Sequence, residues 1–322
     1  MCRQFMYRLG IDLGGTNIVA GVVDENYEII AKASCKTNVP RPESEICDSM
    51  ADVALKAIEK AKLTIDDIES IGIGVPGAVN PKTGVIEYSA NLFFHNWQVV
   101  KMMEERLNTK ICVENDANAA ALGEMTYGVA RGMKNFIDVT LGTGVGSGIV
   151  INGQMVYGCD GFAGELGHVI MVRGEEGRPC GCGRKGCLEA YCSATGVART
   201  AREFLEKSEE PSLLRDMKPE DITSYDVSVA AGKGDALAKR VYDFTGKMLG
   251  EACADFAAFS SPEAFVFFGG LTKAGDLLMK PVKEAYDKSV LKIFKGKAKF
   301  LVSTLDGSSA AVLGASAVGW DL

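Results

Sequence analysis

Apolar residues alternate with other residues at Leu9, Ile11 and Leu13, which is the period of a β-strand with one buried face. A turn that contains glycine follows, and the chain is then apolar again as far as Val23. Residues 8–24 are therefore predicted to form two strands joined by a hairpin turn. The same arrangement recurs at residues 136–151, around a second glycine-rich turn. This recurrence predicts two related α/β halves, although no sequence repeat is obvious.

Other stretches of the chain carry the patterns of helices and of single buried strands. Helices are predicted where apolar residues return every three or four positions, and strands where short apolar runs end in turn-forming residues. The predicted elements are a strand at 28–33, a helix at 46–61, strands at 71–75 and 111–114, a helix at 117–127, mainly helices after residue 194, a strand at 265–268 and a final helix at 310–318. The polar segment 208–228 is predicted to form a surface insertion.

Composition limits the classes to which the chain can belong. Its 322 residues suffice for one large or two ordinary domains, and 47% apolar with 24% charged residues is typical of a globular protein. The net charge of −7 and the lack of a basic run argue against nucleic acid or an anionic membrane as main partner. No apolar run approaches the ~20 residues that span a bilayer, and no secretory leader opens the chain. A cytoplasmic protein is therefore expected.

The two glycine-rich turns are candidate phosphate sites. Glycine lets the backbone amides approach phosphate oxygens closely, and each turn also carries a threonine, Thr16 or Thr143. Asp12, before the first turn, is suited to hold magnesium through water rather than to touch phosphate. A single glycine-rich turn more often has only a structural role than a phosphate-binding one. The hypothesis of a phosphate site therefore depends on the presence of two such turns. Neither matches the Gly-x4-Gly-Lys-Ser/Thr loop or the Gly-x-Gly-x2-Gly dinucleotide motif.

Asp116 is the candidate catalytic base. It follows Asn115 at the end of a predicted strand, where α/β proteins bind ligands. A carboxylate there can accept a proton from a hydroxyl group that attacks phosphorus. The alternative is that Asp116 is only the N-cap of the alanine-rich helix that follows. The local sequence leaves both interpretations open.

His168 is followed by Cys180, Cys182 and Cys187, which together are the ligand inventory of a closed tetrahedral zinc site. Interleaved glycines allow so short a segment to wrap a metal. A disulfide is the alternative, but clustered cysteines in a cytosolic chain stay reduced and more often bind metal or do redox chemistry. A nucleic-acid-binding finger is disfavoured, because the spacing differs from the two-plus-two patterns. Structural zinc is therefore predicted.

Together these motifs resemble the ROK family of repressors, open-reading-frame proteins and sugar kinases. The resemblance covers Asp12 to Gly314, and its most specific part is the pair Glu165 and His168 followed by the cysteines and Glu189. It implies the α/β fold of the actin-like ATPases (ribonuclease H-like), with two domains and an intervening cleft. Within the family the chain is most similar to bacterial glucokinases. ATP-dependent phosphorylation of glucose to glucose 6-phosphate is thus expected, with Asp116 as general base.

The resemblance implies a role for each matching residue. The sugar is expected to contact Gly77, Asn91, Asn115, Asp116, Glu165, His168 and Glu189. The phosphates and magnesium of ATP are expected at Asp12, Gly14, Gly15, Thr16, Asn17, Gly142, Thr143 and Gly144, and the adenosine at Gly269 and Gly270. Zinc is expected on His168, Cys180, Cys182 and Cys187. His168 would use one ring nitrogen for zinc and the other for the sugar, because a bound metal fixes the tautomer.

Three places depart from the family pattern. Asn17 stands where members often carry lysine, and Ala311 stands where a glycine is usual. A tryptophan usually follows the asparagine at position 91 closely. Here Phe93, Phe94 and Trp97 compete for that place, so the sequence does not decide which aromatic residue lines the sugar pocket.

The resemblance also predicts the organisation of the chain. A small domain is expected at residues 1–117, with a C-terminal helix at about 308–322 returning to it. A large domain is expected at 118–307, with the zinc loop at 168–187. A homodimer is expected, with a tetramer as the alternative.

Two alternative functions follow from the same motifs. The sequence does not fix what surrounds carbon 2 of the sugar, so a kinase for another hexose or an N-acetylhexosamine (N-acetylglucosamine, N-acetylmannosamine, fructose) stays open. A sugar-responsive transcriptional regulator is disfavoured, because the first strand starts by Arg8 and leaves no room for a helix-turn-helix domain. It is further disfavoured because Asp116 is retained.

Overall fold

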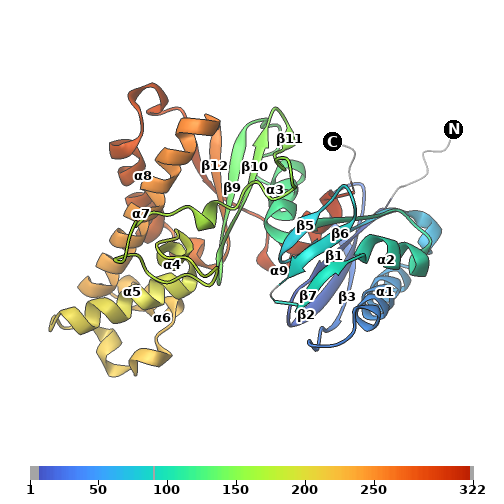
Figure 1. The fold of residues 1–322 in the computed structure, drawn as a ribbon, viewed down its shortest axis with the longest axis horizontal. Coiled ribbons are helices and arrows are strands. Elements are labelled where there is room, and N and C mark those ends of the chain that lie inside the picture. Colours follow the sequence, from blue (N-terminus) through green and yellow to red (C-terminus); the bar gives the residue numbers. More distant parts are fainter. Residues whose placement is uncertain (1–6, 90, 320–322) are drawn as a thin grey trace. The chain divides into compact units, whose positions relative to one another are not determined.

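The computed structural model describes residues 7–89 and 91–319, which form two compact units (Figure 1). Unit 1 holds the chain as far as Lys134, Gly148–Gly164, and the chain from Thr304 onward. Unit 2 holds Asn135–Ser147 and Glu165–Ser303. The predicted boundary lay at residue 117, whereas the structure groups 118–134 and 148–164 with unit 1.

Unit 1 is built on a five-stranded sheet with the strand order β3-β2-β1-β4-β8. The first three strands in the chain pair antiparallel, and β4 and β8 join them in parallel. The elements of this sheet and its helices are β1 (Tyr7–Leu13), β2 (Asn17–Val23), β3 (Ile29–Lys36), α1 (Glu43–Lys60), η1 (Ile65–Asp67), β4 (Ile68–Val75), α2 (Val99–Leu107), β8 (Ile111–Asn115), α3 (Asp116–Thr126) and α9 (Gly307–Ala317). A second, three-stranded antiparallel sheet is formed by β5 (Ala78–Asn80), β6 (Val85–Ser89) and β7 (Phe94–Trp97).

Alternation along β1 sends successive side chains to opposite faces of the larger sheet. Leu9 and Ile11 are fully buried in the core that includes α1. Gly10 lies between them and pairs with Gly72 of β4. A Cβ on Gly10 or on Gly72 would lie 1.9 Å from a backbone oxygen of α9. The last helix therefore returns to this sheet over a glycine-lined surface. Residues 320–322 of the predicted final helix lie outside the described residues.

Unit 2 contains most of a second five-stranded sheet, with the order β11-β10-β9-β12-β13. Its central pair, β9 and β12, is parallel, and so is the pair β12 and β13. The strands are β9 (Phe136–Leu141), β10 (Val145–Ile151), β11 (Gln154–Met155), β12 (Ala264–Phe268) and β13 (Lys299–Val302). The chain leaves unit 2 within β10, and β11 belongs to unit 1.

The remaining regular elements of unit 2 are helices. They are η2 (Leu166–His168), α4 (Glu189–Cys192), α5 (Ala194–Lys207), η3 (Leu213–Asp216), η4 (Pro219–Asp221), α6 (Ser224–Gly232), α7 (Ala236–Ser260), η5 (Gly270–Ala274), α8 (Asp276–Ser289) and η6 (Lys292–Phe294). The predicted preponderance of helices after residue 194 is confirmed, and the predicted strands at 136–141, 145–151 and 265–268 match β9, β10 and β12. The short strands β5, β6, β7 and β13 and the helix α2 were not predicted from the sequence.

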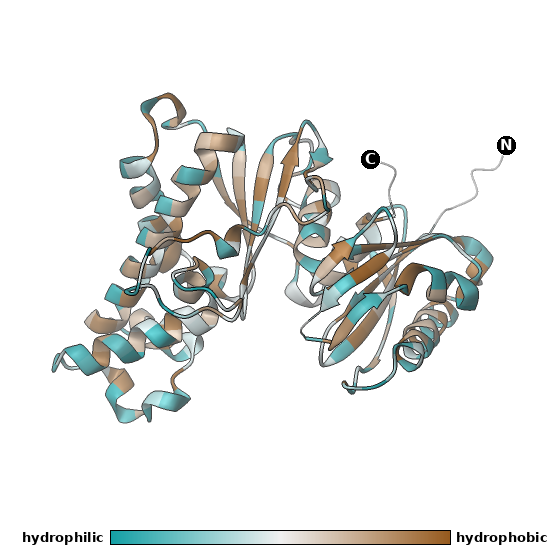
Figure 2. Ribbon diagram, in the orientation of Figure 1, coloured by the Kyte–Doolittle hydropathy of each residue, from teal (hydrophilic) through white to brown (hydrophobic). Residues whose placement is uncertain are grey.

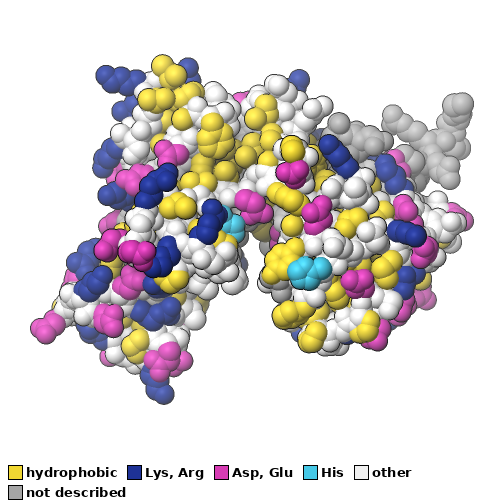
Figure 3. All heavy atoms as spheres, viewed as in Figure 1, with side chains coloured by type: hydrophobic (Ala, Val, Ile, Leu, Met, Phe, Trp, Pro, Cys, Tyr) yellow, Lys and Arg dark blue, Asp and Glu magenta, His cyan; other side chains and the backbone are white. Residues whose placement is uncertain are grey.

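The surface of the helices is polar and carries both signs of charge. Figure 2 shows the strands β9 and β12 in brown and pale tones, whereas α5 carries hydrophilic stretches. Figure 3 shows basic and acidic side chains interspersed on this face of the molecule. Within the described part of the chain, no helix combines the length and the apolar character that a membrane span requires.

Candidate functional site

The first glycine turn joins β1 to β2 in unit 1. The Gly14 amide donates to the Asn17 carbonyl oxygen at 3.0 Å, and the Thr37 hydroxyl donates to the Gly14 carbonyl oxygen at 2.6 Å. Thr16 and Asn17 are exposed at the tip. Asp12 is half-buried at the end of β1, and burial raises the pKa of its carboxyl group to about 6. The hairpin therefore places a carboxylate beside an exposed turn that can receive phosphate.

Asn91 lies beside this turn, and the segment after it settles the place of the three aromatic residues. A Cβ on Gly15 would lie 3.4 Å from the Asn91 carbonyl oxygen. Trp97 is fully buried, and the Phe94 ring packs on it with 4.7 Å between centroids. Phe93 is 67% exposed and has a positive φ of 64°. Phe93 is thus the most exposed of the three.

The corner between β8 and α3 holds the predicted catalytic base. Asn115 Oδ1 accepts from the amides of Ala117 at 2.9 Å and Asn118 at 3.3 Å, and Asn115 Nδ2 donates to the Gly77 carbonyl oxygen at 2.9 Å. Asn115 is therefore the N-cap, and the alternative interpretation of Asp116 as the cap is wrong. Asp116 is the exposed first residue of the helix. Asp116 Oδ1 also accepts from the Ala117 amide at 2.9 Å, which the Asn115 cap already engages.

Glu114 supports this corner, a role that the sequence did not predict. It is 1% exposed, and its Oε1 accepts from the Asn115 amide at 2.8 Å and from Asn118 Nδ2 at 3.1 Å. Burial raises the pKa of Glu114, and burial together with the Glu114 charge raises the pKa of Tyr157. An acidic residue at the end of an apolar strand was the signal that could have found it.

The second glycine turn, in unit 2, is tied to Glu189. The Gly142 amide donates to the Gly144 carbonyl oxygen at 3.0 Å, which closes the turn, and Thr143 is exposed at its tip. Glu189 Oε2 accepts from the Val145 amide at 3.0 Å. A Cβ on Gly144 would lie 2.4 Å from the same oxygen, so only glycine leaves room for the carboxylate there.

Gly269 lies directly behind the second turn. A Cβ on Gly269 would be 2.4 Å from the carbonyl oxygen of Leu141, the last residue of β9. Its φ of 111° is one that other residues rarely adopt. Gly270 opens the short helix η5, and a Cβ there would meet nothing within 4 Å. The predicted phosphate turn and the predicted adenosine residues thus converge within unit 2.

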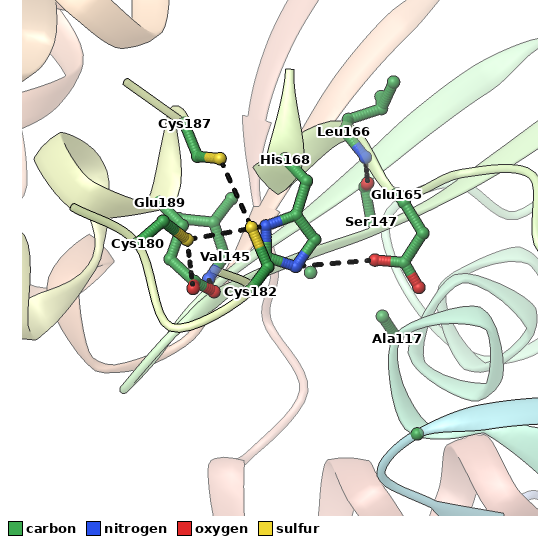
Figure 4. A network of polar contacts seen from close by, with 12 residues as sticks. Ala117, Val145, Ser147, Glu165, Leu166, His168, Cys180, Cys182, Cys187 and Glu189 are labelled. Carbon is green, nitrogen blue, oxygen red and sulfur yellow. Dashed lines mark hydrogen bonds and ion pairs between the residues drawn. The ribbon is translucent and has the colours of Figure 1, made fainter. Parts of the chain in front are cut away.

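The predicted zinc ligands converge in the loop before α4 (Figure 4). One ligand atom from each of His168, Cys180, Cys182 and Cys187 lies within 4.8 Å of all the others. Cys182 Sγ and Cys187 Sγ are 3.6 Å apart, and Cys180 Sγ is 3.7 Å from His168 Nδ1. Tetrahedral zinc with ligand bonds of about 2.0–2.3 Å separates its ligand atoms by roughly 3.5–3.8 Å. The four residues therefore fit zinc.

The chemistry of the thiols also suits a cation. Burial raises the pKa of Cys180 to about 12 and raises that of Cys187. At Cys182 burial acts in the same direction, but hydrogen bonds from the Arg184 backbone and side chain outweigh it and lower the pKa to about 6. A bound metal would deprotonate all three thiols. The sulfur separation of 3.6 Å is far longer than the ~2.05 Å of a disulfide.

His168 presents its two ring nitrogens to different partners. Nδ1 faces the cysteine sulfurs, whereas Nε2 faces Glu165 Oε2 at 4.0 Å (Figure 4). The Glu165 side chain is 63% exposed. Ser147 Oγ accepts from the Leu166 amide at 3.1 Å and so fixes the start of η2, a contact that the sequence did not predict. One imidazole nitrogen therefore lies at the sulfurs and the other lies on the side of Glu165, and the division between metal and sugar stays a prediction.

The predicted site residues fall into two groups, one in each unit. Unit 1 holds Asp12, Gly14, Gly15, Thr16, Asn17, Gly77, Asn91, Asn115 and Asp116. Unit 2 holds Gly142, Thr143, Gly144, Glu165, His168, Cys180, Cys182, Cys187, Glu189, Gly269 and Gly270. In unit 2, Glu189 links the second glycine turn to the cysteine cluster, through the Val145 amide and Cys180 Sγ.

Comparison with known proteins identifies relatives along nearly the whole chain. The model of the ROK family matches residues 8–320. A glucokinase of Halalkalibacterium halodurans is 39% identical over 313 residues, which are 97% of this chain and 93% of that protein. The E. coli DNA-binding transcriptional dual regulator NagC is 27% identical over 311 residues, 96% of this chain and 74% of the regulator.

A solved structure extends the comparison to the fold. The crystal structure of a ROK family glucokinase from Streptomyces griseus in complex with glucose and AMPPNP superposes with a TM-score of 0.80. It is 32% identical, and the alignment covers 96% of this chain and 98% of that one. The predicted fold class, a two-domain α/β fold of the actin-like ATPases, is confirmed.

Proposed function

The chain belongs to the ROK family, and from this premise we propose that it transfers the γ-phosphoryl group of ATP to the 6-hydroxyl group of glucose. The reaction forms a bond between O6 and phosphorus and breaks the bond between phosphorus and the β,γ-bridging oxygen. ADP leaves with that oxygen, and the proton of the hydroxyl group passes to Asp116. Near-complete alignment with glucokinases, one of them solved with glucose and AMPPNP, supports this reaction.

The protein contributes positioning and charge to such a transfer, because phosphoryl groups require little covalent help. The exposed turn after Asp12 and the turn at Gly142–Gly144 would receive the phosphates with magnesium. Asp12 suits a magnesium ion that keeps its water, provided that the carboxyl group is ionised. Asn91, Glu165, His168 and Glu189 would hold sugar hydroxyl groups, with Gly77 and Asn115 close by. Asn115 Oδ1 already accepts from the helix amides, and one Nδ2 hydrogen is donated to the Gly77 carbonyl oxygen. The other Nδ2 hydrogen can therefore donate to the sugar.

Zinc, on His168 and the three cysteines, would fix the loop and supply no reacting group. Cys180 Sγ donates to Glu189 Oε1 at 3.5 Å. A metal-bound Cys180 is a thiolate and cannot donate, so Oε1 would then be left to accept from a sugar hydroxyl group. Nε2 of His168, on the side away from the sulfurs, would carry the proton and act as a donor.

The structural observation that carries the role of Asp116 is its position at an exposed helix start that Asn115 already caps. Asp116→Asn should lower turnover by ~10²–10⁴, because the amide keeps the shape but accepts no proton. Glucose affinity, measured by calorimetry, should stay within a few-fold. Glu43→Gln, which removes a carboxylate from the first position of α1, is the matched control and should be unaffected. Near-normal turnover of the Asp116 variant would remove this residue from the role.

A cytoplasmic location and a homodimer, with a tetramer as the alternative, complete the proposal. Sedimentation of the purified protein measures the oligomeric state directly. The similarity to NagC reflects the shared family, and the retained Asp116 favours the enzyme over the regulator.

A further inference from the structure

Arg178 places a charged group in the interior of unit 2, in the loop that carries the cysteines. Its side chain is only 7% exposed. The guanidinium group donates to Glu203 Oε2 at 2.6 Å, to Thr200 Oγ1 at 2.9 Å and to the Ala190 carbonyl oxygen at 3.1 Å. A buried cation persists only when it is paired and hydrogen-bonded in this way. The buried charge is therefore held by an organised set of partners, and the proposed function does not use it.

The same residue also holds the loop through its backbone and its stacking. The Arg178 amide donates to the Tyr191 hydroxyl oxygen at 2.9 Å, and its carbonyl oxygen accepts from the Gly186 amide at 2.8 Å. The guanidinium carbon lies 4.6 Å from the centre of the Tyr191 ring and 5.6 Å from that of Phe244. Arg178 thus joins the cysteine loop to α4, α5 and α7.

Helix α4 needs such support, because it is a single turn of four residues. One turn is not stable by itself, since nucleation costs more than its few hydrogen bonds return. Its N-cap residue, Leu188, makes no capping bond through its side chain. Glu189 is the first residue of this turn. Arg178 contacts the two residues that follow it, by a hydrogen bond to the Ala190 carbonyl oxygen and by stacking on the Tyr191 ring.

We propose that Arg178 is a positioning residue that sets the direction of the Glu189 carboxylate for the sugar, separately from the metal. The proposal rests on the proposed function, because it assigns Glu189 a sugar hydroxyl group. A zinc ion on the cluster would constrain the loop through Cys187, on one side of Glu189. Arg178 constrains the turn from the other side, through Ala190 and Tyr191. A carboxylate fixed from both sides keeps its bond to the Val145 amide and offers its other oxygen in one direction.

Arg178→Met tests this, because methionine fills part of the space but offers no donor. We expect the KM for glucose to rise about tenfold or more, which corresponds to about 1.4 kcal/mol of lost binding. The KM for ATP should stay within twofold, and metal analysis should still find about one zinc per chain. Amide hydrogen exchange at residues 188–192 should become faster. Arg178→Lys should recover part of the effect, since lysine keeps the charge but not the planar fork.

Arg199→Met is the matched control. Arg199 donates to the other oxygen of the same carboxylate, Glu203 Oε1, at 2.9 Å. Both variants therefore remove one ion pair from Glu203, and Arg178→Met also removes the bond to the Ala190 carbonyl oxygen and the stacking on Tyr191. We expect Arg199→Met to leave both KM values and the exchange of residues 188–192 unchanged. An equal effect of the two variants would overturn the proposal, because the effect would then belong to the ion pair alone.

Other outcomes also decide the question. An unchanged glucose KM in zinc-loaded Arg178→Met would overturn the proposal, and so would loss of the zinc in parallel with the rise in KM. If this variant does not fold, Tyr191→Phe replaces it, since it removes only the hydroxyl group that accepts from the Arg178 amide. It should raise the glucose KM by a smaller factor with zinc retained, and an unchanged KM there would count against the proposal. Failure of the wild-type protein to phosphorylate glucose would instead contradict the proposed function.

Discussion

Two aspartates of the candidate site differ in their surroundings, and this difference separates their roles. Asp116 is exposed at the start of a helix, whereas Asp12 is half-buried at the end of a strand, where burial raises its pKa to about 6. A raised pKa means that the folded chain holds the proton more tightly than the unfolded chain, whose carboxyl group titrates near 3.8. Ionisation of Asp12 therefore lowers the free energy of unfolding, as expected for a carboxylate whose charge a bound cation would stabilise.

Asp12→Asn removes this cost. Below about pH 4 the carboxyl group is protonated in both states and the cost is absent, and as pH rises through about 6 it develops fully. We expect the free energy of unfolding of the variant, minus that of the wild type, to grow by ~1–3 kcal/mol between pH 4 and pH 8. Urea denaturation in magnesium-free buffer measures it. A difference that stays constant over this range would contradict the raised pKa.

At the residue scale, the sequence predicts which residue types belong to the site but not how two neighbours divide the work. Asn115 and Asp116 are both good N-caps, and only the backbone geometry shows that Asn115 takes the cap. Arg178 could not be predicted in the same way. The hydrogen-bond partners of its guanidinium group lie 12 to 25 residues further along the chain, and a lone arginine in a polar loop carries no pattern.

At the scale of elements, long periodic segments were predictable and short ones were not. The predicted helix at 46–61 corresponds to α1, and the predicted hairpin at 8–24 corresponds to β1 and β2. The strands β5, β6 and β7 have three to five residues each, which is too short to show a clear period. Their sheet is defined by pairing between strands, which a single sequence does not reveal.

The contact of α9 with the sheet of unit 1 depends on glycines that face it. Gly72→Ala would bring a Cβ to 1.9 Å from the Ala315 carbonyl oxygen, so the helix would have to move. Overpacking of this kind typically costs ~1–3 kcal/mol. We therefore expect the free energy of unfolding to fall by that amount, which urea denaturation would show as a lower midpoint. Gly232→Ala, in α6, is the control, because a Cβ there meets nothing within 4 Å. Equal stability of the Gly72 variant and the wild type would show that α9 does not lie against this strand.

The cysteine loop carries the proposed zinc site. Cys182→Ser should abolish zinc binding, lower the melting temperature and raise the glucose KM together, because metal binding and loop folding are coupled. Cys159→Ser, at an exposed cysteine of unit 1, should change none of the three. Metal analysis, thermal melting and kinetics on the same preparations test this. Full activity in verified metal-free protein would mean that zinc does not organise the sugar site.

At the scale of the whole molecule, the sequence divides its chemistry between two units that the chain enters more than once. The chain passes from one unit to the other after residues 134, 147, 164 and 303. Residues expected to act on one substrate pair are therefore spread over the full length of the chain. This explains why the alignment with glucokinases is nearly complete, and why the resemblance, rather than any local pattern, predicted the fold.

The preferred sugar is the property of the whole molecule that the family resemblance leaves most open. We expect glucose to exceed N-acetylglucosamine, N-acetylmannosamine and fructose in kcat/KM. Glu165, His168 and Glu189 offer a dense set of polar atoms, and an acetamido group at carbon 2 would displace some of their hydroxyl partners. Each buried polar group left unpaired costs ~1–3 kcal/mol, which corresponds to a preference of about tenfold or more.

A panel of these sugars with purified protein, magnesium and ATP measures that preference. Glu189→Gln should raise the glucose KM more than the ATP KM. The glutamine side chain has one acceptor oxygen where the carboxylate has two, so it cannot accept from both the Val145 amide and a sugar hydroxyl group in the same way. The exposed Glu206→Gln, on α5, is the control for the loss of one negative charge. If an amino sugar instead exceeds glucose tenfold, the space around carbon 2 is larger than the polar groups imply. The phosphoryl-transfer chemistry would then stand, and glucose would not be its natural acceptor.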